Sequence, residues 1–409
     1  MRCRHCGSEL ALDVLDLGTA PPSNAYLDAS SPAAHERCYP LRVKVCTHCW
    51  LVQTEDYAGA AELFDASYSY FSAYSSTWLA HAQAYVAAMT TRFELGPDSQ
   101  VVEIAANDGY LLQYVVARGI PCYGVEPTAS TAAAARGRGI EIVQEFFGTR
   151  LADELSACGR KADLIVANNV LAHVPDINDF AAGFSRLLKP VGVATFEFPD
   201  LVELIDHAQF DTIYHEHYSY LSLLAVERVF AQAGLRVFDV ERLTTHGGSL
   251  RVFAERQDTG RRPVRESVCA RRALEAARGV ATPGYYRSLQ GRAERMRDDL
   301  VAFLVETSRR NEIVAAYGAA AKGNTLLNFA GIRPDLIPFV VDRNPSKQKK
   351  LLPGSHIPIV DEEKLRAQRP RWVLILPWNL RGEIMQQLAY IRDWGGAFVT
   401  AVPELKILH

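Results

Sequence analysis

Two pairs of cysteines, each with two residues between its members, constrain the start of this chain more than any other feature. They are Cys3 with Cys6 and Cys46 with Cys49. Four thiolates at this spacing suit a tetrahedral zinc ion, and four sulfur ligands leave no open position for a catalytic water. Residues 1–56 can bury little apolar surface, so bound metal would supply much of the folding free energy. The sequence therefore predicts a structural zinc lobe, rather than two pairs of reduced surface cysteines.

Composition narrows the class of protein. A chain of 409 residues exceeds one ordinary core, so two or three domains are expected. No apolar run approaches the length of a bilayer span, and the N-terminus lacks a signal-peptide core, so we expect a cytoplasmic protein without a membrane partner. A net charge of -3 creates no global positive field, which argues against a nucleic-acid partner. The other cysteines are scattered singly, as in a reducing compartment.

The middle of the chain predicts a doubly wound sheet. Five strand–helix units are followed by two close strands, and this order favours seven strands whose last pair is antiparallel. A helix over about 77–93 precedes them. The predicted strands are Val101–Ala106, Cys122–Glu126, Ile140–Glu145, Asp163–Asn168, Gly192–Phe198, Leu235–Val240 and Ser249–Glu255.

A second alternation follows a charged connector. The Arg-rich stretch 256–312 predicts one long helix or two, and the strand pattern restarts at Ile313. We therefore expect a zinc lobe at 1–56, an α/β domain at 57–255, a helical connector at 256–312 and a smaller α/β domain at 313–409.

The first strand of the middle domain ends in a candidate cofactor loop. Residues 103–109 read E-I-A-A-N-D-G, and Asp108 and Gly109 fall at the turn into the next helix. Small residues let a ligand approach the backbone, and a helix N-terminus favours anionic or hydrogen-bonding groups. Glu126 ends the second strand, where an acid can accept both hydroxyls of a ribose. No G-x-G-x-x-G is present, which argues against a dinucleotide.

This segment resembles the E/D-x-G-x-G-x-G loop of class I S-adenosylmethionine methyltransferases, with alanine and asparagine in place of the first two glycines. The resemblance implies a Rossmann-like, seven-stranded fold and S-adenosylmethionine as cofactor. Phe146 and Phe147 would sandwich adenine or belong to the core. The cofactor-binding residues that it implies are Ala105, Asn107, Asp108, Gly109, Glu126, Pro127, Phe147, Asn168 and Asn169.

A run of proton-transfer groups follows the fifth strand. Residues 213–220, I-Y-H-E-H-Y-S-Y, bring together imidazoles, a carboxylate and phenols. Histidine has the intrinsic pKa of a base that works near neutrality, and a phenol or amide can hold a developing enolate oxygen. An interdomain plug is the structural alternative, and the HExxH spacing of a metal site is missing. Further upstream, the aromatic segment Tyr57–Tyr74 is expected to pack a linker rather than stack on a ligand.

The last domain offers a candidate phosphate cradle. Residues 317–324, Y-G-A-A-A-K-G-N, join a strand to a helix, and small residues, a helix N-terminus and Lys322 suit a pyrophosphate. Asp342-Arg343-Asn344 ends the next strand. A complete Walker loop is absent, which argues against ATP hydrolysis, and a Rossmann-like domain packed without ligand is the alternative.

The whole series of motifs resembles the C-methyltransferases of deoxysugar biosynthesis. The CxxC pairs, the altered cofactor loop, Y-H-E-H-Y-S-Y-L-S, the 246–251 segment H-G-G-S-L-R and the 317–323 segment occur in this order along the chain. The resemblance is strongest to the tetronitrose branch of antibiotic sugar pathways. It implies that a dTDP-linked 3-amino-4-keto-2,3,6-trideoxyhexose sits between the middle and C-terminal domains and is methylated at C3 through an enolate.

The resemblance also assigns roles. It makes His217 the base at C3, Tyr214 and Glu216 its active-site partners, and His173 a neighbour of the transferred methyl. It adds Tyr68 and so reverses the packing interpretation for that residue. The substrate-binding residues that we predict are Tyr70, His246, Lys322, Asn324 and Arg343.

Two other interpretations remain open at this level. An O- or N-methyltransferase acting on a related nucleotide sugar would need no enolate. A zinc-ribbon nucleic-acid methyltransferase would need a concentrated basic face, for which the stretch 256–312 is the one candidate, although it also carries many acids. The sequence leaves the oligomeric state open, a monomer included.

Overall fold

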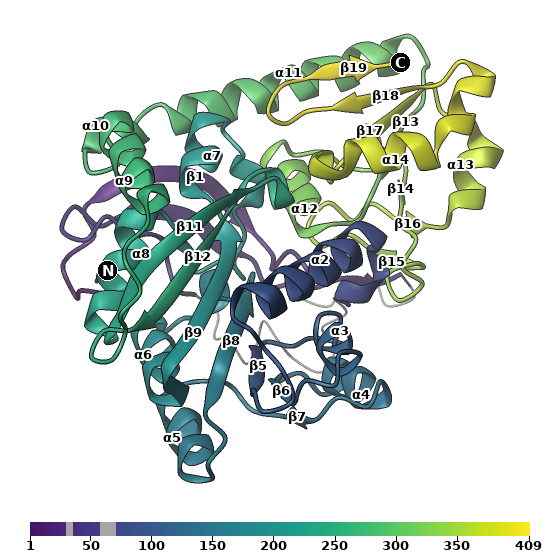
Figure 1. Cartoon of the computed structure of the whole chain (residues 1–409). Coiled ribbons are helices and arrows are strands. Elements are labelled where there is room, and N and C mark those ends of the chain that lie inside the picture. The colour runs from purple at the N-terminus through teal and green to yellow at the C-terminus, as the bar shows by residue number, and fades with distance from the viewer. Residues whose placement is uncertain (30–35, 58–70) are drawn as a thin grey trace.

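The computed structural model of the chain describes residues 1–29, 36–57 and 71–409 (Figure 1). Its described strands form sheets of four, seven, six and two strands. The predicted fold class is confirmed: a small N-terminal lobe, a class I methyltransferase sheet and a C-terminal Rossmann-like sheet. Among the described residues, the helices are all too short or too polar to cross a bilayer.

The N-terminal lobe is built on an antiparallel sheet in the order β1-β3-β4-β10. Its strands are β1 (Leu12–Ala20), β3 (Tyr39–Val45), β4 (Val52–Thr54) and β10 (Ser219–Tyr220). The last of these strands comes from the 213–220 segment, where Ser219 pairs with Gln53 and Tyr220 with Val52. The lobe therefore incorporates part of the candidate active-site segment in its own sheet, which the sequence did not indicate.

The seven-stranded sheet runs in the order β11-β12-β9-β8-β5-β6-β7. β12 runs opposite to the other six strands and pairs antiparallel with β11 and β9, so the predicted antiparallel last pair is found. The strands are β5 (Val101–Ile104), β6 (Cys122–Val125), β7 (Ile142–Val143), β8 (Ala162–Asn168), β9 (Leu188–Pro199), β11 (Leu235–Leu243) and β12 (Ser249–Arg256). The direction of the winding reverses between β5 and β8, which opens a crevice at the carboxyl ends of these strands.

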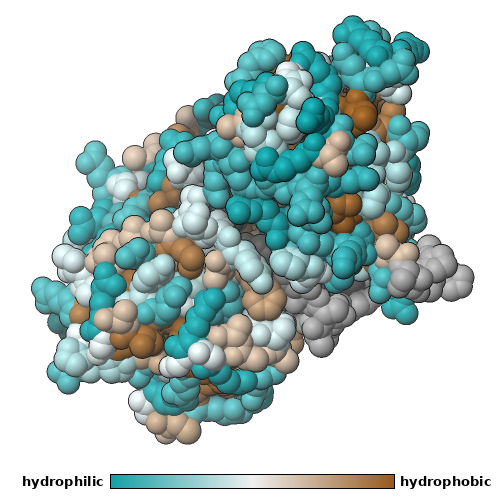
Figure 2. Space-filling view, turned by 90° about the vertical axis from the view of Figure 1, so that its right-hand side faces the viewer, coloured by the Kyte–Doolittle hydropathy of each residue, from teal (hydrophilic) through white to brown (hydrophobic). Residues whose placement is uncertain are grey.

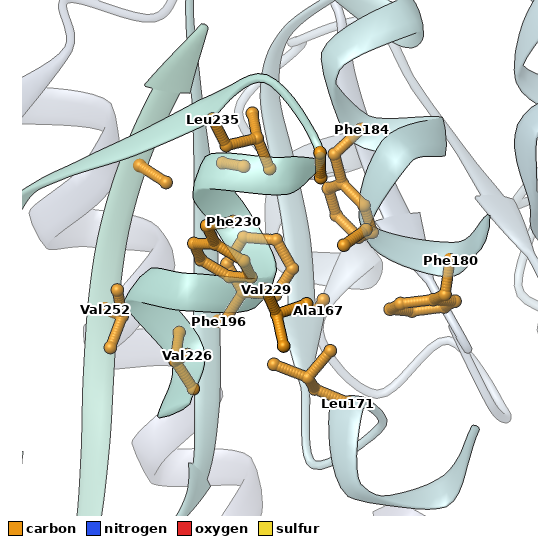
Figure 3. Close-up of a cluster of buried hydrophobic side chains, with 14 of the residues drawn as sticks. Ala167, Leu171, Phe180, Phe184, Phe196, Val226, Val229, Phe230, Leu235 and Val252 are labelled. Carbon is orange, nitrogen blue, oxygen red and sulfur yellow. The ribbon is translucent and has the colours of Figure 1, made fainter. Parts of the chain in front are cut away.

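Helices cover both faces of this sheet because its strands are apolar on both sides. One face is covered by α2 (Ser76–Arg92), α3 (Leu112–Val116) and α4 (Ala129–Gly137). The other is covered by α5 (Thr149–Ala157), α6 (Ile177–Leu187) and α8 (Leu223–Gln232). Phe184 of α6 and Phe230 of α8 contact Phe196 of β9 in this second core, and Phe180 packs against Phe184 (Figure 3). Aromatic packing of this kind fixes where the strand ends lie.

The connector forms three helices rather than the one or two expected. They are α9 (Glu266–Arg278), α10 (Pro283–Tyr286) and α11 (Leu289–Arg309). Gly279 ends α9 in the left-handed conformation, and Pro283 begins α10, so the connector is interrupted between these two helices. Buried Arg271 of α9 contacts Asp200 at 2.5 Å and Glu275 at 2.9 Å, which ties the connector to the middle domain.

The C-terminal sheet runs in the order β16-β14-β13-β17-β18-β19, parallel except for its last strand. The sequence pattern predicts four of its strands, at Ile313–Tyr317, Pro338–Val341, Trp372–Leu376 and Ala397–Thr400, and the structure adds β16 and β19. Its elements are β13 (Val314–Tyr317), α12 (Ala321–Phe329), β14 (Val340–Val341), β16 (Ile359–Val360), α13 (Glu362–Gln368), β17 (Trp372–Ile375), α14 (Arg381–Gln387), β18 (Ala397–Thr400) and β19 (Lys406–Leu408). A separate pair, β2 (Leu27–Asp28) with β15 (Lys350–Leu351), joins this domain to the N-terminal lobe.

Shorter elements complete the molecule: α7 (Leu201–Asp206) and the 3-10 turns η1 (Ser72–Tyr74), η2 (Leu171–His173), η3 (Phe210–Thr212), η4 (Thr245–Gly247), η5 (Trp378–Leu380) and η6 (Ala389–Trp394). Figure 2 shows a hollow near the centre of one face, where the C-terminal domain above meets the middle domain below.

Candidate active site

The four paired cysteines meet at one point of the N-terminal lobe. The sulfur atoms of Cys3, Cys6, Cys46 and Cys49 all lie within 4.8 Å of one another. A tetrahedral ion with Zn–S bonds of about 2.3 Å requires sulfurs roughly 3.8 Å apart, so the donor set fits zinc. Each CxxC turn also closes in the same way: the residue after the second cysteine donates its N–H to the carbonyl of the first, at 2.9 Å and 2.8 Å.

The zinc lobe holds the backbone of the 213–220 segment. Besides the β4–β10 pairing, the Thr54 hydroxyl donates to the His217 carbonyl at 3.1 Å, and the Thr54 N–H donates to the Tyr218 carbonyl at 3.2 Å. Arg4 lies over the Tyr218 ring, 5.2 Å from its centroid. The lobe therefore fixes the three residues that follow His217 as well as His217 itself.

The predicted cofactor loop lies at the carboxyl end of β5, in the crevice between β5 and β8. Glu126 accepts hydrogen bonds from the N–H groups of Asn107 and Thr128, each at 2.9 Å, so it ties this loop to the end of β6. Burial raises the pKa of Glu126. Asn107 and Asp108 accept hydrogen bonds from η1, at 3.0 Å and 3.2 Å. The loop is thus fixed from two sides before any ligand binds.

Polar atoms without a partner point to a ligand in this crevice. Asn168 ends β8 and Asn169 follows it, and the buried Oδ1 atoms of Asn169 and Asp108 have no hydrogen-bond partner among the described residues. Buried polar groups are nearly always paired, so these atoms fit a ligand with its own donors. The amino group and ribose of S-adenosylmethionine supply such donors. The residues present therefore fit this cofactor.

The ring of Phe147 packs against the core, and packing was one of the two alternatives that the sequence left open. Its ring lies edge-on to Phe180 at 5.7 Å and to Phe184 at 5.2 Å, within the core under α6. Phe146 is exposed. Contact between Phe147 and adenine stays a prediction, as does the role of half-buried Pro127.

We predict that Gly109→Ala weakens S-adenosylmethionine binding and destabilises the fold. Gly109 has φ +77°, and an added Cβ would lie 2.4 Å from Cδ1 of Ile140. The left-handed conformation alone costs roughly 1–2 kcal/mol for alanine, and the overlap must also displace the cofactor loop. Gly119→Ala is the control, because Gly119 has φ +67° with open space around it. Thermal unfolding and calorimetric titration with the cofactor compare the two; equal effects would contradict the prediction.

Two histidines from different segments meet at the centre of the site. His173 on η2 lies edge-on to His217, with ring centroids 4.5 Å apart, and the Tyr214 ring lies 3.9 Å from His217 on a tilted plane. Burial lowers the pKa of His217 well below 6.5, and electrostatic repulsion from the neighbouring basic groups His173, His246 and Lys322 disfavours its protonation further. Burial also lowers the pKa of His173, to about 4. Both rings are therefore neutral near pH 7.

The backbone fixes the tautomer of His217. Its Nδ1 lies 2.8 Å from the carbonyl oxygen of Thr212, and a carbonyl can only accept, so Nδ1 carries the proton. The lone pair is left on Nε2, which can accept a proton. His215 differs: its Nε2 donates to the Pro40 carbonyl at 3.2 Å, and its ring lies edge-on to Tyr39 of the N-terminal lobe. Nδ1 of His215 also keeps a lone pair, so the two imidazoles differ in their location: of the two, His217 is the one that lies against His173 and Tyr214 at the centre of the site.

Glu216 lies between the N-terminal lobe and the site. Its Oε1 accepts from the backbone N–H and the side-chain amide of Asn24, at 3.2 Å and 3.1 Å. Its Oε2 is buried without a partner among the described residues, and burial raises the pKa of the carboxyl. Asn24 was not identified from the sequence, and nothing local marks it.

Residues at the start of α12 in the C-terminal domain also lie near the centre of the site. Nζ of Lys322, in the first turn of α12, donates to Oδ1 of Asn379 at 2.7 Å. Asn324 donates to the Ser23 carbonyl at 2.6 Å, and the Thr325 hydroxyl donates to the Ile213 carbonyl at 2.8 Å. The start of α12 therefore contacts both the N-terminal lobe and the 213–220 segment.

The other predicted substrate-binding residues lie in different surroundings. His246 in η4 is close to the centre, edge-on to Trp78 at 5.1 Å, and burial and Lys322 lower its pKa to about 4. Arg343 is exposed and donates to Gln387 at 3.1 Å, which places it at the rim of the C-terminal sheet. Tyr68 and Tyr70 lie outside the described residues.

The comparisons with known proteins agree with this architecture. The chain is 34% identical over 406 residues to "C-methyltransferase NovU" of Streptomyces niveus, an alignment that spans 99% of this chain and 96% of that protein. Family models match for "Putative zinc binding domain" at residues 3–64, "Methyltransferase domain" at 78–240 and "C-methyltransferase C-terminal domain" at 244–403. The predicted domain boundaries stay predictions.

Two solved structures match less than half of this chain. One is magnesium protoporphyrin IX methyltransferase (ChlM) from Synechocystis PCC 6803 with bound SAH, at 14% identity over 44% of this chain and 83% of that chain, with a TM-score of 0.36. The other is the PH0226 protein from Pyrococcus horikoshii OT3, at 13% identity over 46% of this chain and 94% of that chain, with a TM-score of 0.37. Identity along the full length, not these partial overlaps, decides the family. The chain belongs to the zinc-containing, S-adenosylmethionine-dependent C-methyltransferases.

Proposed function

We propose that this enzyme methylates C3 of a dTDP-linked 3-amino-4-keto-2,3,6-trideoxyhexose, in a tetronitrose-type antibiotic sugar pathway. The observation that carries the proposal is the geometry of His217. Its Nδ1 proton is held by the Thr212 carbonyl, which leaves the lone pair of the neutral ring on Nε2, beside the rings of His173 and Tyr214. That the relative NovU is named a C-methyltransferase supports carbon as the acceptor atom.

The chemistry needs a base beside a carbonyl. A 4-keto group acidifies the hydrogen on C3, and Nε2 of His217 accepts that proton as the enolate forms. S-adenosylmethionine supplies, when bound, a methyl group on a positively charged sulfur that departs neutral. The Tyr214 ring at 3.9 Å and the His173 ring at 4.5 Å limit the rotation of His217. We assign His173 to the methyl side of the site and Glu216, through its unpaired Oε2, to a polar group of the sugar.

The remaining assignments are proposals of the same kind. Tyr68 completes the catalytic group, and Tyr70, His246, Asn324 and Arg343 bind the nucleotide sugar. S-adenosylmethionine lies against the loop after β5, Glu126 and the asparagines after β8. A cytoplasmic location is expected from the singly placed cysteines of the sequence.

Incubation with labelled S-adenosylmethionine and a panel of dTDP-4-keto sugars tests the proposal. We expect one product with a new carbon–methyl bond at C3, identified by mass spectrometry and NMR. In deuterium oxide, with S-adenosylhomocysteine in place of the donor, the enzyme should exchange the C3 hydrogen. An O- or N-methylated product without C3 exchange would replace this proposal by the corresponding alternative.

A further inference from the structure

A half-buried cation next to the base has no full set of partners. Lys322 carries three N–H donors on Nζ, and one of them is used by Asn379 at 2.7 Å. Among the described residues, no carboxylate oxygen lies within the 4.0 Å of an ion pair, and no second acceptor binds this ammonium. The indole of Trp378 covers it, 4.7 Å from the ring centroid. A desolvated ammonium with free donors favours an anionic ligand.

One short turn fixes both this cation and the base. Within η3, Asp211 accepts from the indole N–H of Trp378 at 2.7 Å, and the next residue, Thr212, holds Nδ1 of His217 at 2.8 Å. Trp378 in turn lies against Lys322. The ammonium of Lys322 and the imidazole of His217 are therefore positioned by adjacent residues, although they come from different domains. The positive charge of Lys322 also acts on the neighbouring imidazoles, because it contributes to the lowered pKa values of both His217 and His246.

We propose that Lys322 is a catalytic residue whose ammonium binds the C4 oxygen of the keto sugar and stabilises the negative charge that develops there. The inference rests on the proposed C3 deprotonation. In that step the proton moves from C3 to Nε2 of His217, the C–H electron pair becomes the C3–C4 double bond, and the carbonyl π pair moves onto the C4 oxygen. The oxygen returns the pair when C3 is alkylated, so Lys322 gains and loses no proton.

The charge balance favours this role. Before the transfer, Lys322 is positive, the Asp211 carboxylate attracts it from beyond ion-pair range, and His217 and the ketone are neutral. Afterwards His217 is positive too, and two neighbouring cations repel unless an anion lies between them. An enolate oxygen is that anion, so the arrangement fits the deprotonated sugar better than the ketone. Such preference for the developing charge is what accelerates a reaction.

The surroundings of Lys322 fit a single oxygen better than a diphosphate. The loop after β13 was predicted as a pyrophosphate cradle, but its first backbone N–H groups are hydrogen-bonded within the protein. The Ala319 N–H donates to the Asp342 carboxylate at 2.8 Å, and the Ala320 N–H donates to the Gly318 carbonyl at 2.8 Å. The Asp342 carboxylate already lies at this loop, 3.9 Å from Nζ of Lys347, and takes the place of an external anion there. Lys322 instead lies beside an amide and an indole, which add no further positive charge.

Lys322→Met tests the inference, with Lys364→Met on the exposed face of α13 as the control. We expect Lys322→Met to slow C3 deuterium exchange at saturating sugar by about 10²–10³-fold, the usual effect of removing one oxyanion donor. Calorimetric affinity for dTDP should change less than about 3-fold, since the diphosphate is held elsewhere. Loss of the positive neighbour should raise the pKa of His217, so the acid limb of the exchange rate should move to higher pH. Lys364→Met should match the wild type.

The outcomes separate the inference from the proposed function. Wild-type exchange together with unchanged exchange in Lys322→Met would overturn the role of Lys322 and leave the C3 chemistry intact. A large loss of dTDP affinity with normal exchange would assign Lys322 to the diphosphate. Absence of wild-type exchange would overturn the proposed function itself. If Lys322→Met does not fold, Asn379→Leu keeps the lysine but releases its ammonium, and an exchange rate and pH profile equal to the wild type would overturn the inference.

Discussion

His217→Asn is expected to reduce kcat for methyl transfer by about 10²–10⁴-fold, the range that a positioned general base contributes. Asparagine can still donate to the Thr212 carbonyl but offers no basic nitrogen to the sugar. Affinity for S-adenosylmethionine should stay close to that of the wild type, because the cofactor loop is held by Glu126 and by η1, not by this ring. Single-turnover product formation, C3 exchange and calorimetry measure the three quantities.

His215→Asn is the matched control. It removes a buried imidazole from the same segment, and so carries a similar cost in folding stability, but that ring bonds to Pro40 in the N-terminal lobe. We expect it to keep most of its turnover. If His217→Asn turned over like the wild type, or if both folded variants lost activity equally, His217 would not be the base.

The pH profile of C3 exchange gives a second test of the same role. The base must be neutral to accept a proton, and burial together with the neighbouring positive groups lowers the pKa of His217 below 6.5. Exchange should therefore stay constant as the pH falls through 6.5 and decline only at a lower pH. An acid limb centred above 6.5 would contradict the buried, neutral imidazole.

The sequence predicted those parts of the fold that depend on local pattern. The strands of the middle sheet are short apolar runs. Parallel strands that are buried on both faces show this pattern in the sequence, so they can be found before their neighbours in the sheet are known. The turn of each CxxC pair is determined by a few consecutive residues, so a shared zinc site for the four cysteines could be predicted. The altered cofactor loop was found because it follows a strand directly.

The contacts that join the domains could not be predicted in this way. Asn24 reaches Glu216 across 192 positions, and Trp378 reaches Asp211 across 167, so no local pattern relates them. The Y-H-E-H-Y run indicated a base but not which imidazole serves, because that depends on carbonyl groups at Thr212 and Pro40. Likewise, the Arg-rich connector gave no sign that Arg271 is buried between acids.

Removal of zinc is expected to have the largest effect of all. Structural zinc contributes about 10–16 kcal/mol of apparent binding free energy in small peptides at pH 7, as much as the whole stability of a typical domain. The N-terminal lobe should therefore unfold when a chelator strips the metal or when Cys46→Ser removes one ligand. Metal content by mass spectrometry, thermal unfolding and kcat measure the result. Cys38→Ser, at an exposed cysteine of the same lobe, should change none of them.

Loss of zinc should abolish catalysis while cofactor binding is retained. Unfolding of the lobe removes the β4–β10 pairing and the Thr54 contacts, and these hold the backbone at His217 and the residues after it. The crevice at the ends of β5 and β8 makes no such contact with β4, so zinc-free protein should still bind S-adenosylmethionine while its C3 exchange is abolished. If zinc-free protein kept its exchange rate, the lobe would be independent of the base. If instead cofactor affinity and exchange fell together, the metal would stabilise the whole chain rather than the segment that carries His217.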